Sequence, residues 1–220
     1  MANIREFFRD FTLANLAGAI YQSWRMIVAG VALGVLALGA WVGNGWYQSR
    51  RDGEASLALI KASAEIRKQQ DTKGRDEAAI KLFRLVSEQH PGTHAGGEAL
   101  IRLGHRLYDL GKYDEARDAF GKYVQDYSRG PLRTMAAIGK AYAEEAKGDL
   151  GAAEKTLLVA IDGGKDDPLF GEAKLGLARI YEGLKKTDDA VKIYEQLAEK
   201  FPQTHWGQYA LERMASLRAK

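Results

Sequence analysis

Residues 98–129 read EALIRLGHRLYDLGKYDEARDAFGKYVQDYSR, a stretch in which one glycine separates two helical patterns. Leucines recur at spacings of three and four before Gly111, and Ala116 and Phe120 lie four apart after it. Such spacing places apolar side chains on one face of a helix. A glycine between two periodic segments commonly marks a turn. The stretch therefore predicts two helices joined by a short turn at Gly111.

The same pattern recurs along the chain with a period of 37 residues. In each period a small residue is followed four positions later by a large apolar residue. A turn residue stands five positions before the small residue. A second match, between residues 90–102 and 201–213, has an offset of three periods. Repeats of this length indicate stacked supersecondary units. The small, large and turn series are Ala79, Ala116, Ala153 and Ala190; Phe83, Phe120, Leu157 and Tyr194; and Gly74, Gly111, Gly148 and Lys185.

Helices are expected throughout the region after the first fifty residues, because no stretch there alternates with the period of a strand. Thr93 and Thr204 are candidate N-caps, and Asp167 precedes Pro168 as a cap before a first-turn proline. The fold class is therefore all-α, a solenoid of helix hairpins with a C-terminal capping helix. The expected helices cover 55–70, 76–89, 94–110, 114–127, 132–147, 150–162, 168–184, 188–200 and 204–218.

A membrane-spanning helix is expected over residues 25–48. No charged residue occurs between Arg25 and Arg50, and about 20 residues suffice to cross ~30 Å of hydrocarbon. A buried core helix would rarely lack charge for so long, and a cleaved signal peptide would end in small residues. We therefore expect an uncleaved anchor in contact with lipid. Aromatic residues flank it, as at bilayer interfaces: Tyr21, Trp24, Trp41, Trp46 and Tyr47.

Two further features accompany the span. Residues 1–24 have apolar residues at roughly helical spacing with charges between them, which suits an interfacial helix or a helix packed on another subunit. Glycines four residues apart within the span permit close helix packing. These are Gly30 with Gly34, and Gly39 with Gly43.

Composition argues against several function classes. The net charge is +3 without a large basic run, so a nucleic-acid partner is not expected. The chain has no cysteine, and the proline and glycine between His90 and His94 break any shared helix face. No nucleophile with a paired base and no glycine-rich phosphate loop emerges. We therefore expect no catalytic residue, metal, cofactor or small-molecule substrate.

These patterns resemble the tetratricopeptide repeat family over residues 74–220. The resemblance is strongest in residues 98–129 and 171–202, and residues 49–73 are interpreted as a connecting helix and degenerate first repeat. Lys140 and Glu144 replace usual apolar residues in the middle unit, and Arg67 occupies a small-residue position in the first. The resemblance implies a protein-binding fold.

The whole-chain layout resembles the bacterial ancillary SecYEG translocon subunit family, a short N-terminal segment followed by one span and such repeats. The repeats alone also resemble the C-terminal domain of the Tol-Pal-associated cell-division coordinator. The first resemblance implies a single-pass protein of the bacterial inner membrane with a cytoplasmic N-terminus. Its repeats would lie in the periplasm and assist secreted proteins. Positive charges on the two sides of the span are nearly balanced, so the orientation depends on this resemblance.

The expected partner surface is the concave side of the solenoid, lined by the first helix of each pair. A mixed aromatic, aliphatic and acidic row could hold a peptide. We expect a scaffold or adaptor that binds translocon components or secreted clients, with a structural accessory subunit of a membrane complex as the alternative. The candidate residues are Glu98, Ile101, His105, Tyr108, Asp109, Met135, Ile138, Tyr142, Glu145, Glu172, Leu175, Arg179 and Glu182.

Overall fold

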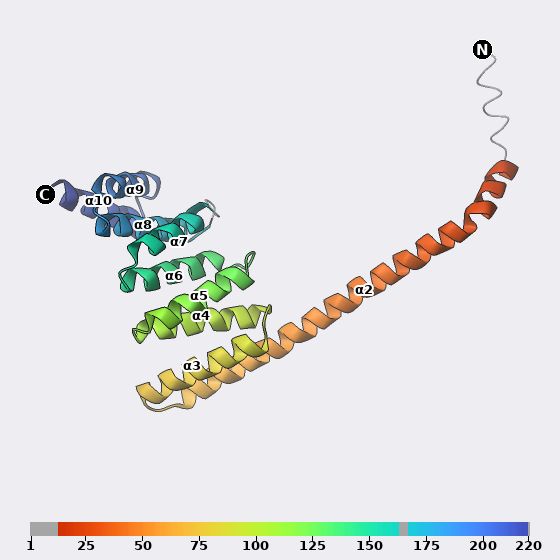
Figure 1. Cartoon of the computed structure of the whole chain (residues 1–220), viewed down its shortest axis with the longest axis horizontal. Coiled ribbons are helices and arrows are strands. Elements are labelled where there is room, and N and C mark those ends of the chain that lie inside the picture. The colour runs from red at the N-terminus through yellow and green to blue at the C-terminus, as the bar shows by residue number, and fades with distance from the viewer. Residues whose placement is uncertain (1–12, 163–166, 220) are drawn as a thin grey trace, which may run out of the picture. The chain divides into compact units, whose positions relative to one another are not determined.

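The computed structural model describes residues 13–162 and 167–219, and all regular structure in these ranges is helical. The chain divides into two compact units, Met1–Arg51 and Asp52–Lys220. Figure 1 labels the helices in chain order. They are α2 (Leu13–Lys68), α3 (Thr72–Gln89), α4 (His94–Asp109), α5 (Tyr113–Asp126), α6 (Arg133–Ala146), α7 (Leu150–Asp162), α8 (Phe170–Gly183), α9 (Thr187–Lys200) and α10 (His205–Arg218).

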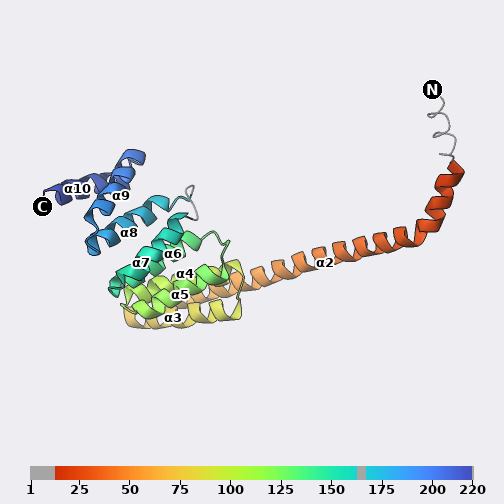
Figure 2. The same ribbon diagram turned by 45° about the horizontal axis from the view of Figure 1, so that its top comes forward.

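The second unit is a stack of antiparallel hairpins (Figures 1 and 2). Each helix from α3 to α10 packs on the next in the chain. In addition, α4 contacts α6, α6 contacts α8, and α8 contacts α10. The odd-numbered helices α3, α5, α7 and α9 make no such series of contacts. The even-numbered helices therefore lie closer together and form the inner side of the stack, as an α-solenoid requires.

The core follows the 37-residue period. The four repeat alanines are at most 1 % exposed, and three of the four large residues that follow them are as deeply buried. Phe83 is the exception at 8 %. At Gly104 a Cβ atom would lie 2.7 Å from the Phe120 ring, so only glycine lets α4 approach α5 this closely. The repeat prediction is confirmed.

The turns within the hairpins share one backbone conformation. Gly111 and Gly148 have φ angles of 72° and 84°, and Lys185 has 60° at the equivalent position. A lysine in this left-handed region is strained, whereas glycine is not. Gly74 differs because it lies inside the first turn of α3, where its N–H donates to the Asp71 side chain.

Helix caps agree with the sequence at two of three positions. Thr93 and Thr204 cap α4 and α10, and their hydroxyls accept from the N–H groups of Gly96 and Gly207. The prediction for Asp167 is wrong in detail, because α8 begins only at Phe170. Asp167 instead accepts a hydrogen bond from Leu169 N–H, which shapes the turn before the helix.

One continuous helix, α2, runs through the expected span and on to Lys68. Its later part belongs to the second unit and buries Ala55, Leu59, Ala62 and Ile66. No break separates the span from the first repeat helix, because no proline stands between them. The expected connecting helix is thus the continuation of the span.

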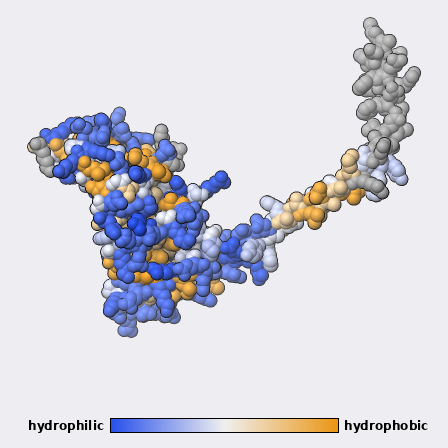
Figure 3. All heavy atoms as spheres, in the orientation of Figure 1, coloured by the Kyte–Doolittle hydropathy of each residue, from blue (hydrophilic) through white to orange (hydrophobic). Residues whose placement is uncertain are grey.

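The apolar part of α2 is long enough to cross a membrane, and the residues that define it are exposed. Figure 3 shows this stretch as a band of hydrophobic side chains along the helix. Among the described residues, no atom would lie within 4 Å of a Cβ atom added at Gly30, Gly34, Gly39 or Gly43. An exposed apolar helix of this length indicates a membrane anchor. Residues 1–12 of the expected interfacial segment lie outside the described residues, and the remainder, from Leu13, belongs to α2.

Candidate protein-binding surface

The thirteen predicted surface residues all lie on α4, α6 and α8, on the inner side of the stack. Their burial divides them into two groups. Ile101, Ile138 and Leu175 are only 5–7 % exposed and belong to the hydrophobic core. These aliphatic side chains hold the helices together and offer little surface to a partner. The polar and aromatic members, together with Met135, remain at least partly exposed.

Glu145 and Arg179 join α6 to α8. The guanidinium of Arg179 donates two hydrogen bonds to the Glu145 carboxylate, at 2.8 and 2.7 Å. The same guanidinium lies 4.7 Å from the centre of the Tyr142 ring. Its planar fork suits a bidentate pair and ring stacking at once. The hydrogen bonds to Glu145 raise the pKa of Arg179, which is therefore always charged.

Glu172 and Glu182 connect the last three inner helices. Glu172 accepts from the Tyr142 hydroxyl and from the Trp206 indole N–H. Glu182 accepts from the buried Tyr194 hydroxyl at 2.7 Å and from Arg213 through two nitrogens. Burial, followed by the hydrogen bonds to these carboxylates, raises the pKa of both tyrosines. The phenols stay protonated and act as donors.

Arg213 lies on α10 at the end of the stack. Its side chain is 40 % exposed, but its charge is paired with Glu182. Arg218 pairs with Glu195 of α9, and Lys220 lies outside the described residues. Sequence reasoning missed Arg213 and Trp206 as parts of this network. The match between residues 90–102 and 201–213 was a usable signal, because Arg102 is the counterpart of Arg213 and also pairs with a glutamate.

The N-terminal part of the surface is less occupied. Tyr108 is half-buried, and its ring meets that of Tyr113 edge-on at 5.3 Å. His105 is exposed and lies edge-on to Phe120. Desolvation lowers the pKa of His105, with Asp109 acting in the opposite direction. The imidazole is therefore mostly neutral at pH 7 and can both donate and accept.

An open pocket of about 360 Å³ lies beside this part, between α2 and α4. Glu98, one of the predicted residues, lines it and forms an ion pair with Arg102. Leu59 and Ile60 form its apolar wall, and Ile60 is 62 % exposed. The pocket thus combines apolar surface with charges of both signs. Such a surface suits an extended or helical segment of another protein.

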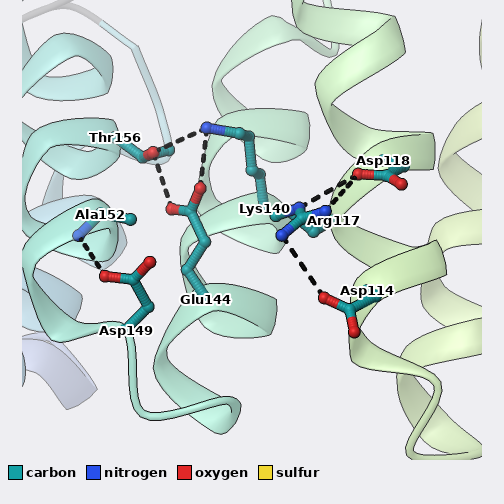
Figure 4. Close-up of polar contacts among 8 residues, drawn as sticks. All are labelled: Asp114, Arg117, Asp118, Lys140, Glu144, Asp149, Ala152 and Thr156. Carbon is teal, nitrogen blue, oxygen red and sulfur yellow. Dashed lines mark hydrogen bonds and ion pairs between the residues drawn. The ribbon is translucent and has the colours of Figure 1, made fainter.

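The two polar residues that depart from the repeat pattern have a structural explanation on the outer side. Glu144 is only 5 % exposed, yet its carboxylate is paired (Figure 4). Lys140 lies 2.8 Å from one carboxylate oxygen, and the Thr156 hydroxyl donates to the other at 2.8 Å. The Lys140 amine also donates to Thr156, at 3.0 Å. A buried charge is tolerated when it is paired and hydrogen-bonded in this way.

Comparison with known proteins agrees with this architecture. Tetratricopeptide repeat family models match residues 101–168 and 172–204. Among solved structures, nearly identical TPR-like repeats from Podosopora anserina superpose with a TM-score of 0.58 at 16 % identity, covering 76 % of this chain and 86 % of that one. MamA from Desulfovibrio magneticus RS-1 gives 0.53 at 17 % identity, covering 75 % and 93 %.

The chain therefore contains tetratricopeptide repeats in residues 101–168 and 172–204, preceded by an N-terminal apolar helix. Among characterised proteins it is similar to the ancillary SecYEG translocon subunit of Neisseria gonorrhoeae. The two sequences are 24 % identical over 183 residues, which is 82 % of this chain and 84 % of the relative. The matched repeats point to a protein-interaction scaffold, because each repeat is a helix hairpin that stacks to form an extended binding surface.

Proposed function

We propose that the protein is an adaptor anchored in the bacterial inner membrane, whose repeats bind proteins on the periplasmic face beside the translocon. The observation that carries the proposal is the open inner surface formed by α4 and the later part of α2. It combines exposed His105, half-buried Tyr108 and a mixed pocket, whereas the corresponding polar groups farther along are bound to one another. The similarity to a translocon subunit supports the location. Clients would be exported segments held near the membrane, in a chaperone-like role.

Crosslinking in intact membranes tests the partner. A photoreactive residue in place of Asp109 should give adducts with translocon subunits or with exported chains. Adding the double substitution His105→Ala and Tyr108→Ala should reduce these adducts at least fivefold, since both side chains are accessible. The exposed pair Lys192→Ala and Glu199→Ala on α9 is the matched control and should leave the yield unchanged. Equal yields from both double variants would exclude the inner surface as the binding site.

The orientation needs a separate measurement. Protease added to spheroplasts should degrade the repeats if they lie in the periplasm, while a cytoplasmic marker stays intact. Protection of the repeats until the membrane is lysed would place them in the cytoplasm and contradict the proposal.

A structural accessory subunit is the second candidate, favoured by the open glycine faces of the span. In that case the span, in contact with lipid elsewhere, would carry the binding. Substituting Gly34→Leu and Gly39→Leu in the full chain should then abolish co-purification with the membrane complex. The inner-surface variant His105→Ala with Tyr108→Ala would retain it. The opposite pattern supports the adaptor function.

A further inference from the structure

A second pocket, on the outer side of the stack, differs from the others in charge. It has a volume of about 340 Å³ and lies where α5, α6 and α7 meet. Its floor and walls are largely apolar, and the lining includes Val124, Ala137 and Val159. Val159 is 56 % exposed, and its neighbour Leu158 is 43 % exposed. None of its lining residues belongs to α2 or α4, which carry the proposed adaptor function.

The charged residues of this pocket, which we call the outer pocket, are all cationic: Arg133, Lys140 and Lys155. Four other surface pockets in the described part of the chain are each lined by at least one carboxylate, such as Glu199, Glu88, Glu98 or Asp76. The charged side chains that line the outer pocket are therefore of one sign and lie over apolar surface, which favours an anionic ligand.

Two of the three cations have no acidic partner within the described ranges. Lys140 is neutralised by Glu144, as Figure 4 shows. Arg133 and Lys155 form no ion pair there, and the Nε atom of Arg133 is buried without an acceptor. Asp167 approaches the start of α6, but its carboxylate accepts from the Thr134 hydroxyl and from Leu169 N–H. The buried Nε–H of Arg133 thus lacks the acceptor that a buried donor normally has.

The position of Arg133 strengthens this point. It is the first residue of α6, and the first turn of that helix contains no acidic residue. Helix N-termini carry a partial positive charge, so a cation there is unfavourable unless an anion compensates it. A cation at this helix N-terminus, with its Nε–H unpaired, does not stabilise the isolated chain. An anion bound from outside would satisfy both the guanidinium and the helix terminus.

We propose that the outer pocket binds a short peptide segment of a partner protein that carries aliphatic side chains beside carboxylates. The aliphatic groups would cover Val124 and Val159, and the carboxylates would pair with Arg133 and Lys155. This site is separate from the inner surface and does not depend on the proposed function. A chain bound there would leave the inner side of the stack free for another partner.

The test uses the full chain in nanodiscs of neutral phosphatidylcholine. The probe is a fluorescent hexapeptide of alternating leucine and glutamate, and its match has lysine in place of glutamate. Fluorescence anisotropy should show binding of the acidic peptide at least tenfold tighter than of the basic one. Lys155→Glu should weaken acidic-peptide binding about tenfold, and Lys155→Arg should preserve it. Lys192→Glu, an equal charge change on exposed α9, should have no effect.

Several results would overturn the proposal. One is equal affinity for the two peptides, or no binding of the acidic one. Another is equal weakening by Lys155→Glu and Lys192→Glu, which would mean that net charge alone attracts the peptide. Sodium decanoate is the third probe. If it binds with the same dependence on Lys155 while the acidic peptide does not, the pocket is a site for lipid-like carboxylates and the peptide proposal is wrong. Circular dichroism of each variant verifies that the helices remain intact.

Discussion

The hairpins α4–α5 and α8–α9 are two periods apart and can be compared residue by residue. Their cores are alike, with Ala116 matching Ala190 at 0 % exposure in both. Their inner rows are not. Tyr108 of the first corresponds to Glu182 of the second, and Phe120 corresponds to Tyr194. In the second hairpin the Tyr194 hydroxyl donates a hydrogen bond to the Glu182 carboxylate.

The two differences, Tyr194 in place of Phe120 and Glu182 in place of Tyr108, belong together, because the tyrosine hydroxyl and the carboxylate bond to each other. Replacing a phenylalanine by a tyrosine in a closed core requires an acceptor, and the inner row supplies it as a glutamate. The same carboxylate then holds Arg213 of α10. The C-terminal hairpin thus uses its inner row for its own stability. In the first hairpin His105 is exposed and Tyr108 is partly exposed, as the proposed binding surface requires.

The largest expected effect comes from Glu182→Ala. The substitution leaves the Tyr194 hydroxyl buried without an acceptor and Arg213 without its carboxylate. We expect the free energy of unfolding to fall by about 2–4 kcal/mol. At the equivalent position Tyr108→Phe should change it by no more than about 0.5 kcal/mol, as for surface substitutions. Chemical denaturation of the full chain in detergent, followed by circular dichroism, measures both. Similar losses in the two variants would show that the two inner rows do not differ as described.

The second test of the comparison exchanges the core residues Phe120 and Tyr194. Phe120→Tyr places a hydroxyl where no glutamate stands on the inner row, and a Cβ at Gly139 would already lie 2.7 Å from the tip of this ring. We expect a loss of about 1–3 kcal/mol. Tyr194→Phe removes the hydrogen bond to Glu182 and should lower the free energy of unfolding by about 1 kcal/mol. A neutral Phe120→Tyr would mean that the first hairpin already contains an acceptor.

The sequence predicted the fold well because repeats encode local geometry. Periodic alanines and aromatic residues specified which faces pack, and Thr93 and Thr204 marked helix starts through contacts three residues away. Helix boundaries lie within a few residues of expectation. The exception is the unbroken α2, where a continuous helix and two abutting helices give the same apolar pattern.

The candidate surface was less predictable, because its contacts join residues about thirty positions apart. Whether Arg179 meets Glu145 depends on the twist between successive hairpins, which no local pattern states. Glu144 was visible as a departure from the repeat, but its pairing with Thr156 required α7 to be placed. The burial of Ile138 and Leu175 likewise follows from how closely the inner helices approach. Sequence thus placed these residues on the inner helices but could not say which of them pair with one another.

The turns of the two hairpins also differ, and here the C-terminal hairpin is the less stable one at its turn. Gly111 and Lys185 share the left-handed conformation, which only glycine adopts without strain. Lys185→Gly should raise the free energy of unfolding by about 0.5–1 kcal/mol, and Gly111→Ala should lower it by about 1 kcal/mol. Thermal unfolding of the two variants beside the parent chain measures both signs. If Lys185→Gly were destabilising, the lysine side chain would have to make a contact that outweighs the strain.

The smallest expected effect is a difference between the two inner rows in how stability depends on pH. His105 corresponds to Arg179, and only the histidine titrates near neutrality. Because desolvation lowers the pKa of His105 in the folded chain, the unfolded chain binds the proton more readily. Its contribution to stability is therefore fully present above the unfolded pKa of about 6.5, and it is lost as the pH falls from that value through the lower pKa of the folded chain. The parent chain should lose slightly more stability between pH 7.5 and 5.5 than His105→Gln does. Denaturation midpoints at both pH values give the difference, with His205→Gln as the control at an exposed histidine. A parent that loses less than His105→Gln would mean that protonated His105 is favoured in the fold, with Asp109 dominating over burial.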